Sequence, residues 1–339
     1  MKGFLKKAGF VLIRLPSILL ILGCLFIFIS NNILSFGFSL LLPELLFLNI
    51  ITGVYWLLKK NKLALLSILG LIVYFLCFDS FLQLNSSKLI ELDNSVLKPV
   101  TLSILTYNAN GFKHDNNDID EQIVNFIKSK NPDVFCIQEF SAIKYKYFKD
   151  YPFWYKTNIF TVNKSVMAVF SKYPIMDKGY IEFPDSSNGA MYVDLKKNEK
   201  IVRVYNIHLE SFKIRKDFYN FSEVTGYNSL RYRISKAEKM RKDQADILIS
   251  HISKFDGKTV ICGDFNSTQF SYAYRNLKNS KKDTFIESGY GFGGTYSRRN
   301  YPFRIDFILV DNDIDVLSHQ NFNLKLSDHE PIFTSLVIN

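Results

Sequence analysis

The sequence predicts a mixed α/β sandwich of two packed sheets, preceded by three transmembrane helices. Three long apolar runs fill the first 84 residues, which predicts the helices. Beyond them, strand and helix patterns alternate at first, and later strands pair locally, which favours two packed sheets over a doubly wound single sheet. We divide the chain into a membrane domain at 1–84, a linker at 85–99 and one folded domain at 100–339.

The apolar runs are Phe10 to Ser30, Ile33 to Leu58 and Leu63 to Leu84. Each is long enough to cross a hydrocarbon core, which needs about 20 helical residues. A cleaved signal peptide is the alternative for the first run, but no small-residue cleavage site follows it. Glu44, beside Pro43, is either a functional intramembrane carboxylate or, as we favour, a protonated or hydrogen-bonded acid in a kinked helix.

The distribution of lysines predicts the orientation of these helices. Three lysines lie in the first seven residues and three more at 59–62, whereas Asn31 and Asn32 between the first two runs are uncharged. The positive-inside rule then places the N-terminus in the cytoplasm. We predict an integral protein of the cytoplasmic (plasma) membrane, with its folded domain on the outer face, periplasmic or extracellular.

Composition does not by itself indicate a nucleic-acid-binding protein, a zinc protein or a disulfide-rich one. Of the 42 basic and 32 acidic residues, seven and two precede residue 85, which leaves the folded domain only mildly basic. A nucleic-acid-binding protein usually clusters its bases along one face. The four cysteines have neither zinc-site spacing nor the pattern of a disulfide framework.

The elements of the folded domain follow in order. "TLSILTYN" alternates as a strand, and residues 118–133 show helical spacing that stops at Asn-Pro. "DVFCIQE" and "VMAVFSKYP" are predicted strands, and residues 190–210 predict a hairpin around a Lys-Asn-Glu-Lys turn. A long helix over Ser235 to Lys254 leads to the strand "TVICGDFN". A short helix near 270–279, a glycine-rich stretch and the strands "RIDFILV" and "PIFTSLVI" complete the domain.

Polar residues end or interrupt the apolar strands. They are Asn108, Glu139, Asn206, His208, Asp264, Asn266 and Asp306. Because strand ends converge at the rim of a sheet, these side chains could meet at one place. Carboxylates and amide oxygens suit Mg²⁺ or Mn²⁺, and histidines add proton donors and acceptors near neutral pH. Such a set is typical of metal-assisted attack of water on a phosphoester.

"SDHEP", Ser327 to Pro331, precedes the closing strand. Asp328, His329 and Glu330 are costly to bury, and proline cannot donate to a sheet ladder, so a plain strand has no use for them. The segment therefore joins the candidate site, with Glu330 expected as a solvated neighbour.

The motifs "TYN", "QE", "NIHLES", "GDFN", "RIDFIL" and "SDHEP", in this order over residues 106–331, resemble the endonuclease/exonuclease/phosphatase superfamily with its DNase I-like fold. The resemblance covers nearly all of the folded domain, although each short motif alone is weak. It implies a four-layered α/β sandwich, two packed mixed sheets flanked by helices, with a divalent-metal hydrolase site. We therefore expect a membrane-anchored member of this superfamily.

The resemblance also implies a metal site. Glu139 would be the principal Mg²⁺ ligand, with Asn108 beside it, and Asp328 would support the ion directly or through water. Mn²⁺ is the alternative ion.

Catalytic roles are implied in the same way. Asp264 and Asn266 would position or activate the attacking water and hold the phosphate. His329 would contact the scissile phosphate or act as general base, with Asp306 accepting a hydrogen bond from its ring. Whether Asp264 or His329 is the base stays open.

His208 would donate to the phosphate or protonate the leaving oxygen, with Asn206 near it. In this superfamily the abasic-site endonucleases usually lack a histidine here, whereas DNase-like and sphingomyelinase-like members carry one. Alone, His208 would more often be a satisfied core histidine, and Asp264 could equally cap a turn. The complete set in family order favours the enzyme.

Basic and aromatic residues interleave over Glu210 to Arg233. This segment is either a substrate-facing loop or lip on anionic head groups, or an ordinary insertion that packs on the core. The same composition suits single-stranded nucleic acid.

We therefore expect a membrane-anchored, Mg²⁺-dependent phosphoesterase that hydrolyses a lipid head group or another small phosphodiester outside the cytoplasm. An extracytoplasmic endonuclease or exonuclease is the alternative, so nucleic acid is a possible but not favoured substrate. A non-catalytic binding or scaffold protein on the same fold is the alternative of another class.

Overall fold

The computed structural model describes residues 13–85, 100–112, 117–141, 146–157, 165–212, 224–298 and 301–339. Residues 86–99 of the predicted linker and 213–223 of the basic and aromatic segment lie outside this description. The chain forms two compact units. Unit 1 comprises Met1–Phe81, Phe212–Lys242 and Phe270–Tyr272, and unit 2 comprises Leu82–Ser211, Asp243–Gln269 and Ala273–Asn339.

Three apolar helices make up most of unit 1: α2 (Leu15–Ile29), α3 (Ile33–Leu58) and α4 (Ala64–Cys77). Asn32 separates α2 from α3 because its side chain accepts from the backbone N–H of Leu34 and Ser35, while Ser35 Oγ accepts from the Asn32 N–H. This reciprocal cap satisfies backbone donors that the first turn of a helix leaves without partners.

Within the described residues only α3, with 26 residues, is long and apolar enough to cross a membrane. The prediction of three spanning helices is wrong for its first and third runs, because α2 and α4 have 15 and 14 residues. Pro16 lies in the first turn of α2, where its missing N–H costs nothing, and the helix begins there. α4 ends where Phe78 turns extended and caps the Tyr74 carbonyl.

The three helices bury polar groups among themselves and expose apolar ones. Ser17 Oγ lies 2.9 Å from Ser67 Oγ, and Asn49 Nδ2 donates to the Ser67 carbonyl at 3.0 Å. Facing outward, Ile29 and Leu58 are 82% and 80% exposed, in company with many other large apolar side chains of these helices. The unit thus has polar contacts inside and an apolar exterior.

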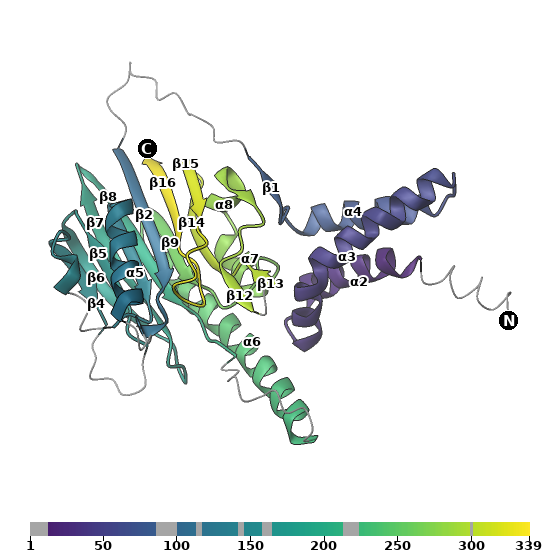
Figure 1. Cartoon of the computed structure of the whole chain (residues 1–339), viewed down its shortest axis with the longest axis horizontal. Coiled ribbons are helices and arrows are strands. Elements are labelled where there is room, and N and C mark those ends of the chain that lie inside the picture. The colour runs from purple at the N-terminus through teal and green to yellow at the C-terminus, as the bar shows by residue number, and fades with distance from the viewer. Residues whose placement is uncertain are drawn as a thin grey trace, which may run out of the picture. The chain divides into compact units, whose positions relative to one another are not determined.

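Unit 2 contains two six-stranded mixed sheets (Figure 1). The first has the order β15 (Ile314–Asn321), β16 (Ile332–Ile338), β2 (Val100–Asn108), β3 (Val134–Gln138), β5 (Ala168–Ser171), β4 (Phe153–Lys156). The second has the order β10 (Lys281–Asp283), β14 (Asp306–Asp311), β9 (Lys258–Asp264), β8 (Lys200–His208), β7 (Gly189–Lys197), β6 (Ile175–Glu182). β2 pairs with β3 and β8 with β9 in parallel, and the other pairs are antiparallel.

The remaining described elements are short, apart from two helices. They are β1 (Gln83–Leu84), η1 (Asn110–Phe112), α5 (Asn117–Lys130), α6 (Val224–Ile252), α7 (Tyr272–Lys278), α8 (Thr284–Ser288), β11 (Tyr290–Gly291), β12 (Tyr296–Arg298) and β13 (Tyr301–Phe303). α6 begins eleven residues before the predicted long helix. β1 pairs with β11 and β12 with β13.

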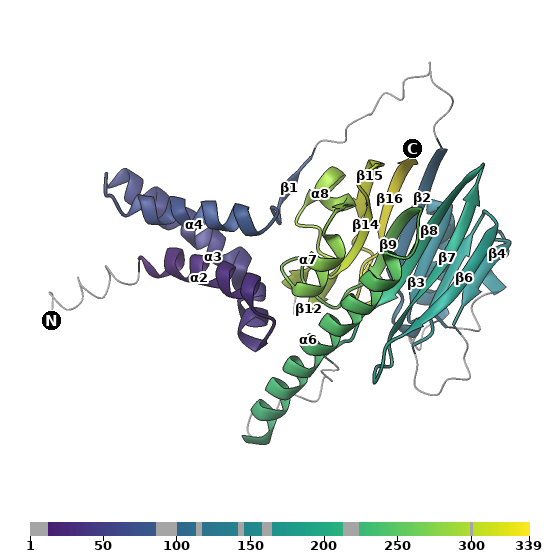
Figure 2. The ribbon, with the colours of Figure 1, turned by 180° about the vertical axis from the view of Figure 1, so that it is seen from behind.

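Apolar side chains between the two sheets form the central core of unit 2, for example Ile104 and Cys136 from the first sheet and Val204 and Cys262 from the second. α5 packs on the outer face of the first sheet. The second half of α6, with α7, covers the outer face of the second sheet, as Figure 2 shows. These four layers match the expected two packed mixed sheets flanked by helices.

Arg304 and Asp283 form a buried ion pair next to the start of β14. Arg304 Nη1 donates to Asp283 Oδ2 at 2.6 Å, and the Tyr274 hydroxyl donates to the same oxygen at 2.6 Å. Burial raises the pKa of Asp283, but Arg304 and the Tyr274 hydroxyl together outweigh burial, and the net shift is downward. His319, also buried, lies beside this pair with Nδ1 2.8 Å from Thr284 Oγ1.

We expect His319 to make the stability of the fold depend on pH. Burial lowers its pKa from 6.5 to about 4, only partly offset by Asp283, and Arg304 lowers it further. The neutral ring therefore contributes stability above about pH 6.5, and this is lost as the pH falls toward 4, by about 3 kcal/mol at most. Thermal unfolding between pH 7 and about pH 4 should show the loss, and His319→Gln should reduce it.

His251→Gln is the comparison: burial, Arg203 and Lys254 also lower the pKa of His251, but this ring is only partly buried, so its substitution should reduce the loss less than His319→Gln does. An unchanged pH dependence in His319→Gln would contradict this account.

Candidate functional site

Strand register brings the polar strand ends together. In the second sheet His208 pairs with Asp264, and Asp306 pairs with Asp264 from the other side. In the first sheet Asn108, the last residue of β2, pairs with Gln138, and Glu139 follows β3. The carboxyl ends of two parallel pairs, one in each sheet, therefore supply the candidate site.

Gly263 permits this register. Its φ is +132°, a conformation that L side chains rarely adopt, and a Cβ there would lie 2.1 Å from the Ile207 carbonyl oxygen. Only glycine lets β9 approach β8 this closely just before Asp264.

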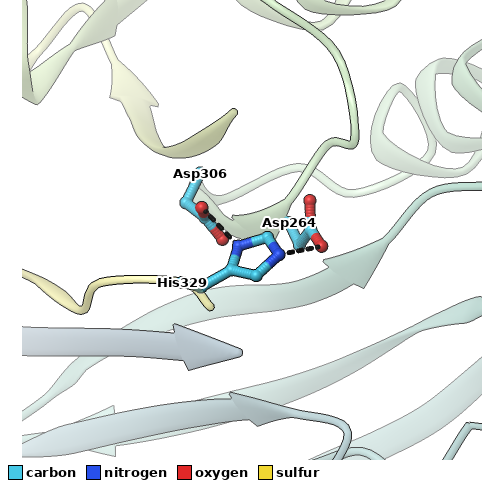
Figure 3. Close-up of side chains that lie close together, drawn as sticks. All are labelled: Asp264, Asp306 and His329. Atoms are coloured by element: carbon cyan, nitrogen blue, oxygen red, sulfur yellow. Dashed lines mark hydrogen bonds and ion pairs between the residues drawn. The ribbon is translucent and has the colours of Figure 1, made fainter. Parts of the chain in front are cut away.

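His329 lies between two carboxylates, as Figure 3 shows. Its Nδ1 is 2.9 Å from Asp306 Oδ2, and its Nε2 is 3.6 Å from Asp264 Oδ2. All three side chains are buried, and one ligand atom from each lies within 4.8 Å of the others. The expected hydrogen bond between the His329 ring and Asp306 is present.

These neighbours decide the charge of His329. Burial lowers its pKa, but the carboxylates of Asp306 and Asp264 outweigh burial and raise the pKa from 6.5 to about 10. The ring is therefore a cation at neutral pH, with a proton on each nitrogen. For Asp264, burial raises the pKa, and the two histidines oppose that rise.

His208 has the opposite character. Burial lowers its pKa, and Asp264 offsets this only in part, so the ring is neutral at pH 7. Its Nε2 lies 3.5 Å from Asp264 Oδ2 and 4.0 Å from Glu139 Oε1. Its Nδ1 is 3.4 Å from Ser165 Oγ, a contact that no sequence pattern indicated.

Two asparagines hold Asp264. Asn108 Nδ2 donates to Asp264 Oδ2 at 3.0 Å, across the two sheets. The Asn266 backbone N–H donates to Oδ1 at 2.7 Å, and its side chain donates to Oδ2 at 3.2 Å and to the Leu209 carbonyl at 2.9 Å. Both residues thus contact the carboxylate rather than standing apart from it.

Glu139 presents a carboxylate to the same place. Its φ of +50° is unusual for a residue with a side chain and marks a backbone held in a special conformation. Its side chain is 32% exposed, in contrast to the buried His208 and Asp264 nearby. It is the accessible acid of the group.

Asp328 and Glu330 flank His329 in the sequence and make contacts of their own. Asp328 is exposed and accepts from Ser327 Oγ at 3.2 Å. Glu330 is not the solvated neighbour that we expected, because its carboxylate accepts from the backbone N–H of Leu324 and Lys325. It closes the loop before β16, which starts only at Ile332.

Thr295 is a second residue that sequence analysis missed. Its Oγ1 accepts from the N–H of Asp306 and of Ile305, and its carbonyl accepts from the Glu330 N–H. Thr295 thereby ties the start of β14 to the segment that carries His329. Its position in the glycine-rich "GYGFGGTYS" was the available signal.

Asn206 does not join the cluster. Its side chain is fully buried between the sheets, where Nδ2 donates to the carbonyls of Ile137 and Ala168, and Oδ1 accepts from Gln138 Nε2 at 2.6 Å. Both its amide nitrogen and its amide oxygen are therefore bonded to the opposite sheet. It fastens the sheets together just below His208.

The donors present fit a divalent cation. Glu139 offers an accessible carboxylate, and Asn108 has an amide oxygen whose one described bond is from the Asn110 N–H. Both are oxygen donors of the kind that Mg²⁺ takes. His329, in contrast, is protonated on both nitrogens and bonded to Asp306, so it is a poor ligand although it lies in the tightest group of acids and histidines.

A buried carboxylate between a cationic and a neutral histidine, beside an accessible acid, combines a proton acceptor, a hydrogen-bond donor and a positive charge, which are groups that hydrolysis of a phosphoric ester can use. The model of the Endonuclease/Exonuclease/phosphatase family matches residues 105–329. The chain therefore belongs to this family, whose members are typically dependent on divalent metals. A sequence comparison with curated proteins gave no significant match.

Solved structures support the fold. Humanized TDP2 of D. rerio is 15% identical, with a TM-score of 0.55 over 70% of this chain and 99% of that one. A family protein of Bacteroides thetaiotaomicron is 17% identical, with a TM-score of 0.52 over 72% and 100%. A mannosyl-6-phosphatase of the same organism is 16% identical, with a TM-score of 0.51 over 70% and 100%.

We expect Asn206→Ala to destabilise the fold by about 2–4 kcal/mol, because it removes three buried hydrogen bonds, two to the carbonyls of Ile137 and Ala168 and one from Gln138. Denaturant unfolding measures the change. Asn323→Ala, at an exposed position, is the control. An unchanged unfolding midpoint for Asn206→Ala would argue that Asn206 does not fasten the sheets.

Proposed function

We propose that this chain is a membrane-attached, Mg²⁺-dependent phosphoesterase that hydrolyses a lipid head group or another small phosphodiester outside the cytoplasm. The observation that carries the proposal is the placement of Asp264 within 3.6 Å of both His208 Nε2 and His329 Nε2. Each proton-transfer and charge-stabilising role in phosphoester hydrolysis then has a side chain to fill it.

Asp264 is the candidate base. A carboxylate whose pKa is raised by burial accepts a proton from water more readily than an exposed one. His329, already cationic, is unsuited to that role and instead places a positive charge where negative charge develops on the phosphoryl oxygens. This favours Asp264 over His329 for the role that the sequence left open.

Glu139, with Asn108, would hold the metal ion, and Asp328, which is exposed and near enough to His329 to help raise its pKa, would contribute through water. When bound, the ion polarises a phosphoryl oxygen and lowers the pKa of its water. His208, neutral and beside Asp264, donates a hydrogen bond to the phosphate or to the leaving oxygen. Asn266 keeps Asp264 in place for the attacking water.

Membrane attachment rests on the helices of unit 1. α3 is long enough to cross a bilayer, and side chains such as Ile29, Leu58 and Leu76 are at least 80% exposed. An apolar surface of this extent needs a covering, and a lipid phase supplies it. Lysines at 59–62 mark the cytoplasmic end of α3 by the positive-inside rule. For unit 2 to lie on the outer face, as we propose, the apolar run Leu63 to Leu84, which is α4 with the extended residues after it, has to return the chain across the membrane.

Full-length protein in detergent should hydrolyse small phosphodiesters with Mg²⁺ and lose that activity when EDTA removes the ion. Glu139→Gln and His329→Ala should each lower kcat by about 10²- to 10³-fold, since each removes a charge that acts on the transition state. A substrate panel of a synthetic diester, a synthetic monoester, a phospholipid, sphingomyelin and plasmid and single-stranded DNA measures both rate and preference.

The matched controls are Glu199→Gln, in the exposed β7–β8 turn, and His251→Ala, on α6. Both should keep full activity. Full activity in Glu139→Gln and His329→Ala would refute the enzymatic site, whereas DNA cleavage without diester or lipid turnover would reverse the order of substrates.

A further inference from the structure

The first half of α6 belongs to the same compact unit as the apolar helices. Asn31, in the turn between α2 and α3, donates from Nδ2 to the Glu238 carbonyl at 3.2 Å. Phe36, in the first turn of α3, packs edge-on against Phe212 with ring centroids 4.8 Å apart. This part of α6 therefore lies beside the end of the helices at which α2 meets α3.

The side of α6 that faces these contacts is buried, and its positive and negative side chains pair with each other. Arg241 is 1% exposed, pairs with the Glu238 carboxylate and lies over the Phe212 ring at 4.2 Å. Glu238 is the one acidic residue between Arg231 and Lys242, a stretch that contains six lysines and arginines. Because that carboxylate pairs with Arg241, no acidic residue of this stretch remains to pair with the lysines and arginines on the other side of the helix.

The opposite side of α6 is exposed and basic. Arg231, Tyr232, Lys236 and Lys239 are all exposed, and their spacing places them on one face of the helix. We call these four residues the α6 basic face. Along the same side the charge then reverses at the exposed Asp243 and Asp246, so the basic face ends where unit 1 ends.

We propose that the α6 basic face docks on the anionic lipid head groups of the membrane in which α2, α3 and α4 are embedded. The proposal rests on the membrane attachment proposed above. Lysines and arginines near a membrane surface are attracted to anionic lipids, and an exposed tyrosine such as Tyr232, 66% exposed, suits the interface between head groups and acyl chains.

A lipid surface fits better than a nucleic acid, although both would accept bases interleaved with aromatics. The basic face shares a unit with helices whose exterior is apolar, and it lies at the end of those helices. Where apolar helices end, the chain meets the plane of the head groups.

The test is protection of Tyr232 from chymotrypsin in full-length protein reconstituted into nanodiscs. Cleavage after Tyr232 should be about tenfold slower in discs of phosphatidylcholine mixed with phosphatidylglycerol than in discs of phosphatidylcholine alone. High salt should abolish the difference, because it screens charges at the surface. Tyr290, which is 74% exposed in unit 2, is the control site: the rate of cleavage after Tyr290 should be the same in both kinds of disc.

Two charge variants distinguish the effect of the α6 basic face from the effect of the protein's net charge. Arg231→Gln/Lys236→Gln/Lys239→Gln should lose the lipid-dependent protection and keep Tyr232 cleavable. Lys128→Gln/Lys146→Gln/Lys149→Gln removes three exposed lysines from unit 2, and this variant should keep the lipid-dependent protection of Tyr232. Equal cleavage of the unmodified protein in both kinds of disc would overturn the proposal, as would protection by single-stranded DNA in phosphatidylcholine discs without protection by anionic lipid.

Diester hydrolysis, measured in the same discs, distinguishes this proposal from the proposed function. Activity without lipid-dependent protection would refute the docking surface and leave the phosphoesterase standing. Failure of the protein to enter discs at all would refute membrane attachment and the docking surface together.

Discussion

The site depends on one buried negative charge. Asp264 is 1% exposed, and a carboxylate in that position is tolerated only with hydrogen bonds and opposite charge around it. Asn266 supplies two donors from its own loop, Asn108 supplies one from the other sheet, and His329 supplies a positive charge. Because these partners come from both sheets, the carboxylate is satisfied only when the sandwich is assembled.

Two histidines of equal burial acquire different charges from their neighbours. His208 has Asp264 on one nitrogen and a serine hydroxyl near the other, and burial wins, so its pKa falls. His329 has a carboxylate on each nitrogen, and attraction wins, so its pKa rises to about 10. One arrangement thus provides both a neutral donor and a fixed cation, and the extra carboxylate of Asp306 makes the difference.

Much of the candidate site could be predicted from the sequence, because the end of a strand can be recognised from a local pattern of residues. Asn108, His208, Asp264 and His329 each follow or precede an apolar strand, and the structure brings them together. Other assignments could not be made locally. Asn206 has the same signal as His208 and lies on the same face of β8, but it is two residues further from the end of the strand, where the opposite sheet binds its side chain.

The sequence by itself determined the apolar character of the N-terminal helices, the order of the elements in unit 2 and the residue types at the strand ends, because these follow from periodicity and composition along the chain. Only the tertiary structure decided the lengths of α2 and α4, the contact of Asn206 with the opposite sheet, the loop-closing role of Glu330 and the part played by Thr295. Each of those depends on what a side chain or a helix end meets across space, and contacts between distant segments leave no local pattern.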